Sequence, residues 1–285
     1  MEIQARIDNI FVEAYSLLDS GGFEKLEQFS GKRILRPSSL CLWKKSLSKD
    51  EWKKADAVYD PKDGWKFKDK EFNDWVLDCN GFKLKLRLQT NGQVGIFPEH
   101  AYYLSHVNDF IAKNSTQALK AINLFAYSGM ASMFLLSHGV EVCHVDSSKK
   151  ALDWAKENAA LNGLPENKLR LISDDALSFL KRENRRENKY DIVILDPPSF
   201  SRLDGKKTWK LEEVLFEFVE NSIGLLAKGG LLVFSCHHHA LDSRILRNVF
   251  TNTGVEILDS QDLAVMEREN KRYLPAGTNI TCRAS

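Results

Sequence analysis

The chain has 285 residues and a formal net charge of +1, with 43% hydrophobic and 28% charged residues. This composition is ordinary for a globular domain, and the near-neutral charge excludes a global basic field, so any nucleic-acid binding must use local patches. The five cysteines are scattered and lack CxxC spacing, which argues against a disulfide framework or a zinc site and indicates a reducing compartment.

The first residues predict a helix and no membrane association. The chain begins Met1-Glu2-Ile3 without an apolar signal core, and no apolar stretch approaches about 18 residues. We therefore expect a cytoplasmic protein with no membrane partner. Apolar residues at helical spacing predict a helix that stops at Gly21-Gly22; they are Ile3, Ile7, Ile10, Phe11, Ala14, Leu17 and Leu18.

Residues 23–88 have the character of a small β-rich region. Short apolar pieces alternate with turn pairs such as Asp63-Gly64 and Asn80-Gly81, and four of the six tryptophans lie here. Lysines interleaved with these aromatics are compatible with stacking of single-stranded nucleic acid, although aromatics packed under lysine stems are the commoner arrangement. We assign residues 1–90 to an N-terminal accessory region with one helix and this β-rich part.

From about residue 118 the pattern alternates between strand and helix, which predicts an α/β fold with a doubly wound, seven-stranded, mostly parallel sheet in a domain over residues 91–285. The predicted strands are Lys120–Ala126, Val140–Asp146, Leu169–Ser173, Tyr190–Leu195, Leu231–Cys236, Val255–Asp259 and Asn279–Ala284. The predicted helices are Ser147–Asn162, Asp175–Arg185, Leu211–Leu226 and Asp242–Thr251.

The run from Lys189 to Phe200 is the most informative stretch. Apolar residues without alternation predict a strand buried on both faces, and the strand stops at Asp196-Pro197-Pro198. In open α/β sheets, ligands bind at the carboxyl ends of the strands. Asp196 there can accept a hydrogen bond from an amine or a base edge, whereas the simpler interpretation is a solvated acid in a turn.

The first strand of the sheet runs into Asn123-Leu124-Phe125-Ala126-Tyr127-Ser128-Gly129 and then opens a helix. Small residues and a glycine allow a ligand to approach the backbone closely. A dinucleotide fold requires GxGxxG for its pyrophosphate, and this loop has a single glycine, so an NAD-dependent dehydrogenase is disfavoured. A ligand without phosphates, such as S-adenosylmethionine, makes no such demand.

Acids end the next strands of the predicted sheet. Asp146 can accept both hydroxyls of an adenosine ribose, and a carboxylate of Asp174-Asp175 can accept the adenine amino group. For each acid, capping of the helix that follows is the alternative. Four successive strands that end in polar or acidic residues are harder to dismiss than any one of them.

Cys236 ends the strand that follows the Asp-Pro-Pro strand, and three histidines come directly after it. Its thiolate can act as a covalent nucleophile, while a buried structural cysteine is the alternative. Adjacent residues of an extended chain point to opposite faces, so we expect His237-His238-His239 to form a polar loop with no metal. The basic segment Ser201–Lys210 is expected to be a loop, either simply solvated or gripping phosphates through Arg202, Lys206, Lys207 and Lys210.

Together these motifs resemble the class I S-adenosylmethionine-dependent methyltransferases, and within them the branch of the bacterial 23S ribosomal RNA methyltransferases of the I and K types. The resemblance covers roughly Phe82 to Ser285. It implies a Rossmann-like fold, S-adenosylmethionine as cofactor and RNA, in particular ribosomal RNA, as partner. By the resemblance, Asp196 and Pro197 lie beside the methyl group, and Phe200 faces the target. The implied cofactor residues are Phe97, Asn123, Phe125, Ala126, Tyr127, Ser128, Gly129, Asp146, Ser147, Asp174, Asp175, Ala176 and Asp196.

Two departures bear on the target atom. Ser199 intervenes before Phe200, where methylases of exocyclic amines carry an aromatic directly after the prolines, and Cys236 matches the cytosine-methylating I type rather than the K type. Because C5 of cytosine needs a thiolate added at C6, this cysteine favours cytosine C5 over a guanine or adenine nitrogen. A small-molecule or protein methyltransferase, and a non-catalytic RNA-binding protein on the same scaffold, remain alternatives. The oligomeric state is left open.

Overall fold

A computed structural model of the chain describes residues 10–11, 14–203, 207–238 and 240–285. The chain divides into two compact units, one of residues 1–102 and 264–276 and the other of residues 103–263 and 277–285. This division records where the chain is compact and not which parts fold alone, so the domain boundary at residue 90 stays a prediction. No helix in the described part of the chain is both long and apolar enough to cross a membrane.

The first unit is rich in strands, as the turn pairs indicated. Its five-stranded sheet has the order β1-β2-β3-β4-β5, in which only β3 and β4 run parallel. The strands are β1 (Tyr15–Gly21), β2 (Glu24–Phe29), β3 (Lys32–Pro37), β4 (Ala57–Asp60) and β5 (Gly64–Phe67), with helix α2 (Lys49–Trp52) before β4. A separate hairpin, β6 (Asp74–Cys79) and β7 (Phe82–Arg87), and the short 3₁₀ helix η1 (Pro98–His100) complete the unit.

The predicted N-terminal helix is wrong over its second half. Residues 1–9 and 12–13 lie outside the described part, Ile10 and Phe11 are helical, and the chain from Tyr15 onward is strand β1. The apolar pair Leu17-Leu18 suits a strand that is buried on both faces as well as it suits a helix, so the spacing was ambiguous. Gly21, with φ of 148°, ends β1, and Gly22, with φ of 59°, begins the turn into β2 instead of ending a helix.

Buried ion pairs fix residues 264–276 within the first unit. Arg272 donates from Nη2 to Asp19 Oδ1 at 2.8 Å and from Nε to Glu267 Oε2 at 2.7 Å, and both carboxylates are fully buried. Asp19 also accepts the indole N–H of Trp52 at 2.9 Å. The indoles of Trp43, Trp65 and Trp75 likewise donate to main-chain oxygens of this unit. The tryptophans therefore pack the unit internally.

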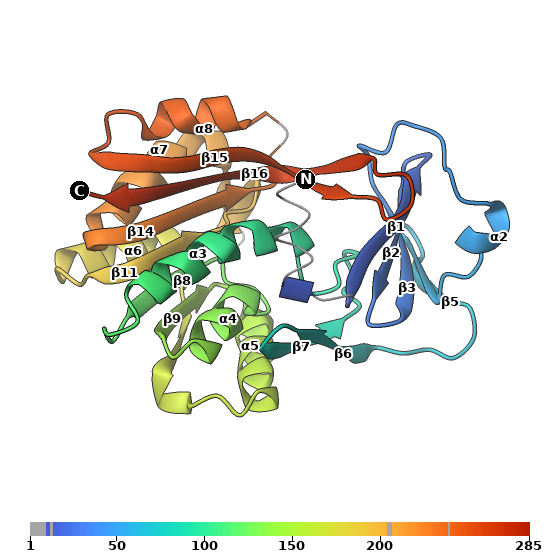
Figure 1. The fold of residues 1–285 in the computed structure, drawn as a ribbon, viewed down its shortest axis with the longest axis horizontal. Helices are drawn as coiled ribbons and strands as arrows, with labels where there is room; N and C mark the ends of the chain where they lie inside the picture. The colour runs from blue at the N-terminus through green and yellow to red at the C-terminus, as the bar shows by residue number, and fades with distance from the viewer. Residues whose placement is uncertain (1–9, 12–13, 204–206, 239) are drawn as a thin grey trace. The chain divides into compact units, whose positions relative to one another are not determined.

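The second unit contains the predicted seven-stranded sheet, in the order β10-β9-β8-β11-β14-β16-β15 (Figure 1). The first five of these strands are parallel, and β16 runs antiparallel to β14. The chain order reverses between β8 and β11, which is the topological switch point of a doubly wound sheet. The strands are β8 (Lys120–Leu124), β9 (Glu141–Asp146), β10 (Leu169–Ser173), β11 (Tyr190–Leu195), β14 (Leu226–Cys236), β15 (Val255–Met266) and β16 (Tyr273–Ala284).

Helices cover both faces of this sheet (Figure 1). On one face, Phe179, Phe218 and Phe250 of three successive helices pack with strand residues such as Leu124 and Val193 in one buried cluster. These helices are α6 (Ala176–Arg185), α7 (Leu211–Gly224) and α8 (Ser243–Phe250). On the other face lie α4 (Met130–Ser137), which contacts β8 and β9, and α5 (Lys149–Leu161), which contacts β9 and β10. The predicted doubly wound α/β fold is confirmed.

Four further elements complete the described part of the chain. Helix α3 (Ala101–Lys113), which the sequence did not indicate to us, precedes β8, and a short 3₁₀ helix η2 (Glu166–Lys168) precedes β10. The prediction that the basic segment is a loop is wrong, because β12 (Phe200–Leu203) and β13 (Lys207–Lys210) pair as an antiparallel hairpin. Asp204-Gly205 is a sequence that favours a hairpin turn, so the signal was present.

Candidate active site at the carboxyl edge of the sheet

Asp196 lies at the switch point of the sheet. The strand before it is apolar and fully buried from Ile192 to Leu195, between neighbours β8 and β14. Pro197 is buried and ends the strand, while Asp196 itself is half-buried. Its main-chain N–H donates to Leu124 O of β8 at 3.5 Å. The two prolines therefore leave one carboxylate at the edge where a doubly wound sheet binds its ligand.

The loop after β8 has an unusual backbone. Phe125, Tyr127 and Gly129 adopt positive φ of 57°, 50° and 90°, although two of them carry large side chains. Non-glycine residues held in this region cost about 1–3 kcal/mol each and cluster at ligand sites. Asn158 of α5 donates to Ser128 O at 2.9 Å, and Ala126 N–H donates to Val145 O at 3.2 Å. These contacts fix the loop at the carboxyl ends of β8 and β9.

Asp146 accepts one hydrogen bond from this loop and one from the residue that caps the next helix. Its Oδ2 accepts the N–H of Tyr127 at 2.9 Å, and its Oδ1 accepts the N–H of Ser148 at 2.8 Å. Burial raises the pKa of this carboxyl, and the two N–H donors oppose that effect. The cap of α5 is Ser148, whose hydroxyl accepts from Ala151 N–H at 3.3 Å. Asp146 is therefore not the cap that the alternative interpretation required.

The two acids after β10 have structural partners. Asp175 is the N-cap of α6, because its Oδ1 accepts from Ser178 N–H at 2.8 Å. Asp174 pairs with Arg182 of the same helix and accepts the N–H of Asp175 at 2.8 Å. Capping, the alternative interpretation, is what the structure shows for Asp175. A role for Asp174, Asp175 and Ala176 beside adenine stays a prediction.

Cys236 ends β14, beside the strand that presents Asp196. Its side chain is fully buried. Burial and the nearby Asp196 charge raise the pKa of the thiol to about 12, against a smaller opposing effect of the His238 N–H. The thiol is therefore protonated at neutral pH in this arrangement, and a nucleophilic role for it stays a prediction.

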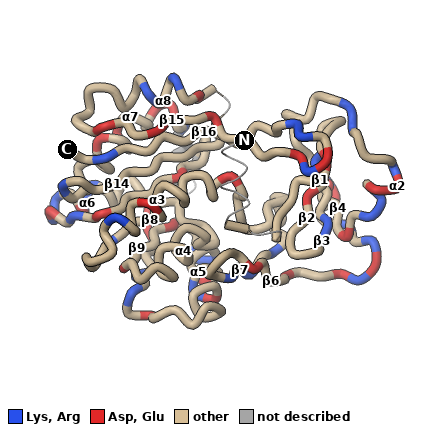
Figure 2. The backbone as a smooth tube through the Cα atoms, viewed as in Figure 1, with Lys and Arg blue, Asp and Glu red and all other residues tan. Residues whose placement is uncertain are grey.

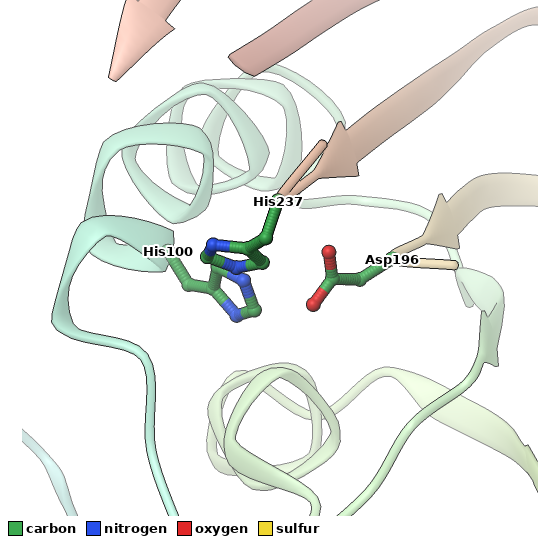
Figure 3. Close-up of side chains that lie close together, drawn as sticks. All are labelled: His100, Asp196 and His237. Atoms are coloured by element: carbon green, nitrogen blue, oxygen red, sulfur yellow. The ribbon is translucent and has the colours of Figure 1, made fainter. Parts of the chain in front are cut away.

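His237 lies near Asp196 and was not among the predicted site residues. Figure 3 shows the imidazole of His237 and the carboxylate of Asp196 facing one another, and their polar atoms lie within 4.8 Å. His100, the third side chain drawn there, belongs to the other compact unit. Ser199 Oγ donates to His237 O at 3.1 Å, so the residue that departs from the family motif ties the Asp-Pro-Pro turn to the loop after β14. Alternation along the extended chain after Cys236 was the available signal.

A buried polar network lies beneath the loop after β8. Asn123 Nδ2 donates to Ser132 Oγ at 3.0 Å, and Ser132 Oγ is 2.9 Å from His144 Nδ1. His144 is fully buried, and burial lowers its pKa to about 3. Asn123 thus supports the loop from below; a direct contact with cofactor stays a prediction.

The described contacts do not test the roles of the remaining predicted residues. Phe97 belongs to the other unit, where its ring lies 5.2 Å from that of His100. Phe200 is 66% exposed on β12, and Lys210 is exposed at the start of α7. Lys206 and the side chains of Arg202 and Lys207 lie outside the described part of the chain. Their roles in binding stay predictions.

The donors at this edge fit an adenosine-type cofactor without a pyrophosphate. Asp146 presents an oriented, half-buried carboxylate at the end of β9, and the loop with Gly129 brings backbone close to the same edge. No glycine-rich turn is available there for phosphates. This combination of sheet, loop and acids defines the class of S-adenosylmethionine-dependent methyltransferases.

Comparison with known proteins agrees with this class. The family model described as S-adenosylmethionine-dependent methyltransferase matches residues 35–263, so the chain belongs to that family. A crystal structure of the SAM-dependent methyltransferase from Agrobacterium tumefaciens is 31% identical, with a TM-score of 0.85 over 95% of this chain and 91% of that chain. S-adenosylmethionine is accordingly the cofactor of this fold.

Two curated relatives are ribosomal RNA methyltransferases. The ribosomal RNA large subunit methyltransferase K/L of Pseudoalteromonas atlantica is 36% identical over 55% of this chain and 21% of its own length. The ribosomal RNA large subunit methyltransferase I of Aeromonas salmonicida is 28% identical over 71% of this chain and 50% of its own length. The chain thus aligns with only a fifth to a half of these relatives.

Proposed function

We propose that the chain transfers a methyl group from S-adenosylmethionine to a base in RNA, with large-subunit ribosomal RNA as the first candidate substrate. The observation that supports this most is the position of Asp196, a half-buried carboxylate held by Pro197 at the switch point beside the Asp146 loop. The ribosomal RNA methyltransferases among its relatives support the choice of RNA. Acidic and basic residues are interspersed along the chain (Figure 2), so RNA contact would use local groups.

The roles of the residues follow from their chemistry. When bound, S-adenosylmethionine supplies an electrophilic sulfonium methyl group. Asp146 would hold the ribose hydroxyls, since an ionised carboxylate accepts two hydrogen bonds. Asp196 would accept a hydrogen bond from an exocyclic amine and take up the proton that this nitrogen must lose. The nearest polar atoms of His237 lie within 4.8 Å of this carboxylate.

For the target atom, the burial of Cys236 supports a nitrogen. Methylation of cytosine C5 requires a thiolate nucleophile, and the Cys236 thiol is fully buried with its pKa raised to about 12. Direct transfer to an amine needs only the acceptor and the orientation that Asp196 provides. Cytosine C5 is the second candidate, because Cys236 ends the strand adjacent to β11.

Methyl transfer to purified large-subunit ribosomal RNA tests the proposed substrate and the proposed role of Asp196. Asp196→Asn should lower the rate by about 100-fold or more, since general acid–base groups contribute about 10²–10⁴, while calorimetric affinity for S-adenosylmethionine changes little. Asp153→Asn, an exposed acid on α5, is the matched control and should act like the natural chain. An Asp196→Asn variant with full activity would rule out the proposed role.

Cys236→Ala separates the two target atoms. The direct route predicts that this variant keeps its rate within about threefold, because the thiol takes no part in the bond changes; the covalent route predicts loss of at least about 100-fold. Thermal unfolding of the variant measures the effect of the methyl-sized cavity independently. Loss of activity in a variant that is still folded would rule out the direct route and make cytosine C5 the target atom.

A further inference from the structure

A cavity lies at the edge of the sheet opposite to Asp196. The amino ends of four adjacent strands, β8, β9, β10 and β11, line an open cavity of about 350 Å³ together with the loops that precede them. The volume is at the lower end of the range for small-molecule sites, about 300–1,000 Å³. Because S-adenosylmethionine is expected at the carboxyl edge, this cavity has no part in the proposed methyl transfer.

The cavity is cationic. Lys120, Lys168, Arg170 and Lys189 line it, and Glu141 is the one carboxylate among the lining residues. A second acid, Asp191, lies nearby and accepts the main-chain N–H of Lys120 at 2.8 Å. Four cations against two carboxylates leave an excess of positive charge, whereas the chain as a whole has a net charge of only +1.

Two of the four cations have a structural task. Lys168 Nζ donates to Gly139 O at 2.9 Å, just after α4, and Lys189 Nζ donates to Gly224 O at 2.6 Å, the last residue of α7. Cations at helix carboxyl ends satisfy open carbonyls and oppose the helix dipole. Both ammonium groups are therefore fixed in place at the cavity, and each has donors left.

The other two cations are available to a ligand. Within the described residues, neither the Lys120 ammonium nor the Arg170 guanidinium makes a hydrogen bond or an ion pair, and both side chains are exposed. The buried wall beside them includes the carboxylate of Glu183, whose charge acts on Arg170. This carboxylate is already bound by Arg186 at 3.0 Å and by the Tyr190 hydroxyl at 2.8 Å, and burial raises the pKa of Cys143 to about 11. Planar guanidinium groups bind phosphate in bidentate fashion, which makes Arg170 the natural anchor.

We propose that this amino-edge cavity, lined by Lys120, Arg170, Lys168 and Lys189, binds a small ligand that carries a phosphomonoester, such as a sugar phosphate. A phosphomonoester has a charge of about −1.5 to −2 at neutral pH, which matches two uncommitted cations better than the single charge of a phosphodiester. A concave cavity of this size also suits a sugar-sized body more than an extended polynucleotide. The inference stands apart from the proposed function, because it uses residues at the other edge of the sheet.

Calorimetric titration of the full chain with ribose 5-phosphate tests the proposal, with ribose as the unphosphorylated control. Saturable binding is expected for ribose 5-phosphate only, and inorganic phosphate should compete. Lys120→Ala and Arg170→Gln should each weaken binding about tenfold, the effect of one charge-assisted hydrogen bond. Exposed residues outside the cavity give matched controls, Lys156→Ala and Arg185→Gln, which should bind as the natural chain does.

Three outcomes would overturn the proposal. They are absence of saturable heat, equal binding of ribose, and unchanged affinity in both cavity variants. If ribose 5-phosphate fails to bind while the same two variants lose affinity for a short RNA, the cavity is instead a contact for the RNA backbone. Affinity for S-adenosylmethionine should be the same in all four variants, so a failure of the proposed function is seen separately.

Discussion

At the scale of single residues, the sequence predicted which side chains stand at strand ends but not what each one contacts. Asp146 and Asp175 looked equivalent as acids after strands, yet Asp146 accepts from the loop after β8 and Asp175 caps α6. Whether an acid or the serine two residues later caps a helix depends on backbone angles that no motif specifies. The burial of Cys236 and the approach of His237 to Asp196 likewise depend on packing between distant segments.

The buried His144 predicts a specific pH dependence of stability. Its pKa is about 3 in the folded chain, against about 6.5 when unfolded, so the unfolded chain alone binds a proton between these values. The stability contributed by the neutral ring is present above pH 6.5 and is lost as the pH falls toward 3. At pH 5 the loss amounts to about 2 kcal/mol.

Urea unfolding at pH 7 and pH 5 checks this expectation in the natural chain and in His144→Gln. The variant removes the titrating group, so its free energy of unfolding should change by about 2 kcal/mol less between the two pH values. Comparing pH differences cancels the cost of the substitution itself. Equal pH dependence in both proteins would show that His144 does not stay neutral when folded.

At the scale of elements, the strands of the parallel sheet were predicted closely because branched apolar runs identify them. Tyr190–Leu195 and Leu169–Ser173 agree with the structure residue for residue. The misses have local causes. The Leu17-Leu18 pair fits two periodicities, and the Ser201–Lys210 segment is polar enough to suggest a loop although its backbone pairs as β12 and β13.

Gly129 connects the loop after β8 to α4, and its replacement tests whether the backbone of this loop shapes the cofactor site. Its φ is 90°, and an added Cβ would lie 3.2 Å from Ala155 Cβ of α5. Gly129→Ala should destabilise the chain by about 1–3 kcal/mol, the usual cost of a side chain in this backbone region, and should weaken S-adenosylmethionine binding at least tenfold. Gly163→Ala is the matched control, because its φ is 60° with nothing within 4 Å of the added atom.

Urea unfolding measures the loss of stability, and calorimetric titration with S-adenosylmethionine measures the loss of cofactor affinity. Both alanine variants should lose stability from backbone strain, and only Gly129→Ala should lose cofactor affinity. If both variants bind S-adenosylmethionine as the natural chain does, the loop does not form the cofactor site.

At the scale of the whole molecule, the sequence indicated two regions but not that the chain returns to the first one near its end. Residues 264–276 belong to the first compact unit, and Arg272 among them pairs with Asp19, which lies 253 positions earlier. No sequence pattern predicts that charged residues such as Asp19, Glu267 and Arg272 pair with one another. Long-range ion pairs of this kind are visible only once the fold is known.

Removing Arg272 tests this connection. Arg272→Ala leaves the carboxylates of Asp19 and Glu267, both fully buried, without their cation, which should destabilise the chain by about 3–5 kcal/mol in urea unfolding. Arg244→Ala breaks an exposed pair with Asp242 and should change stability little. Similar small effects in both variants would mean that the buried pairs do not hold residues 264–276 in place.

The central claim is methylation of an RNA base at the carboxyl edge of the sheet. Mass spectrometry of nucleosides from ribosomal RNA tests it most directly, in cells that lack the gene and in the same cells given either the natural chain or Asp196→Asn. We predict that one methylated nucleoside disappears without the gene and returns with the natural chain but not with Asp196→Asn. An unchanged nucleoside profile, or full restoration by Asp196→Asn, would contradict the claim.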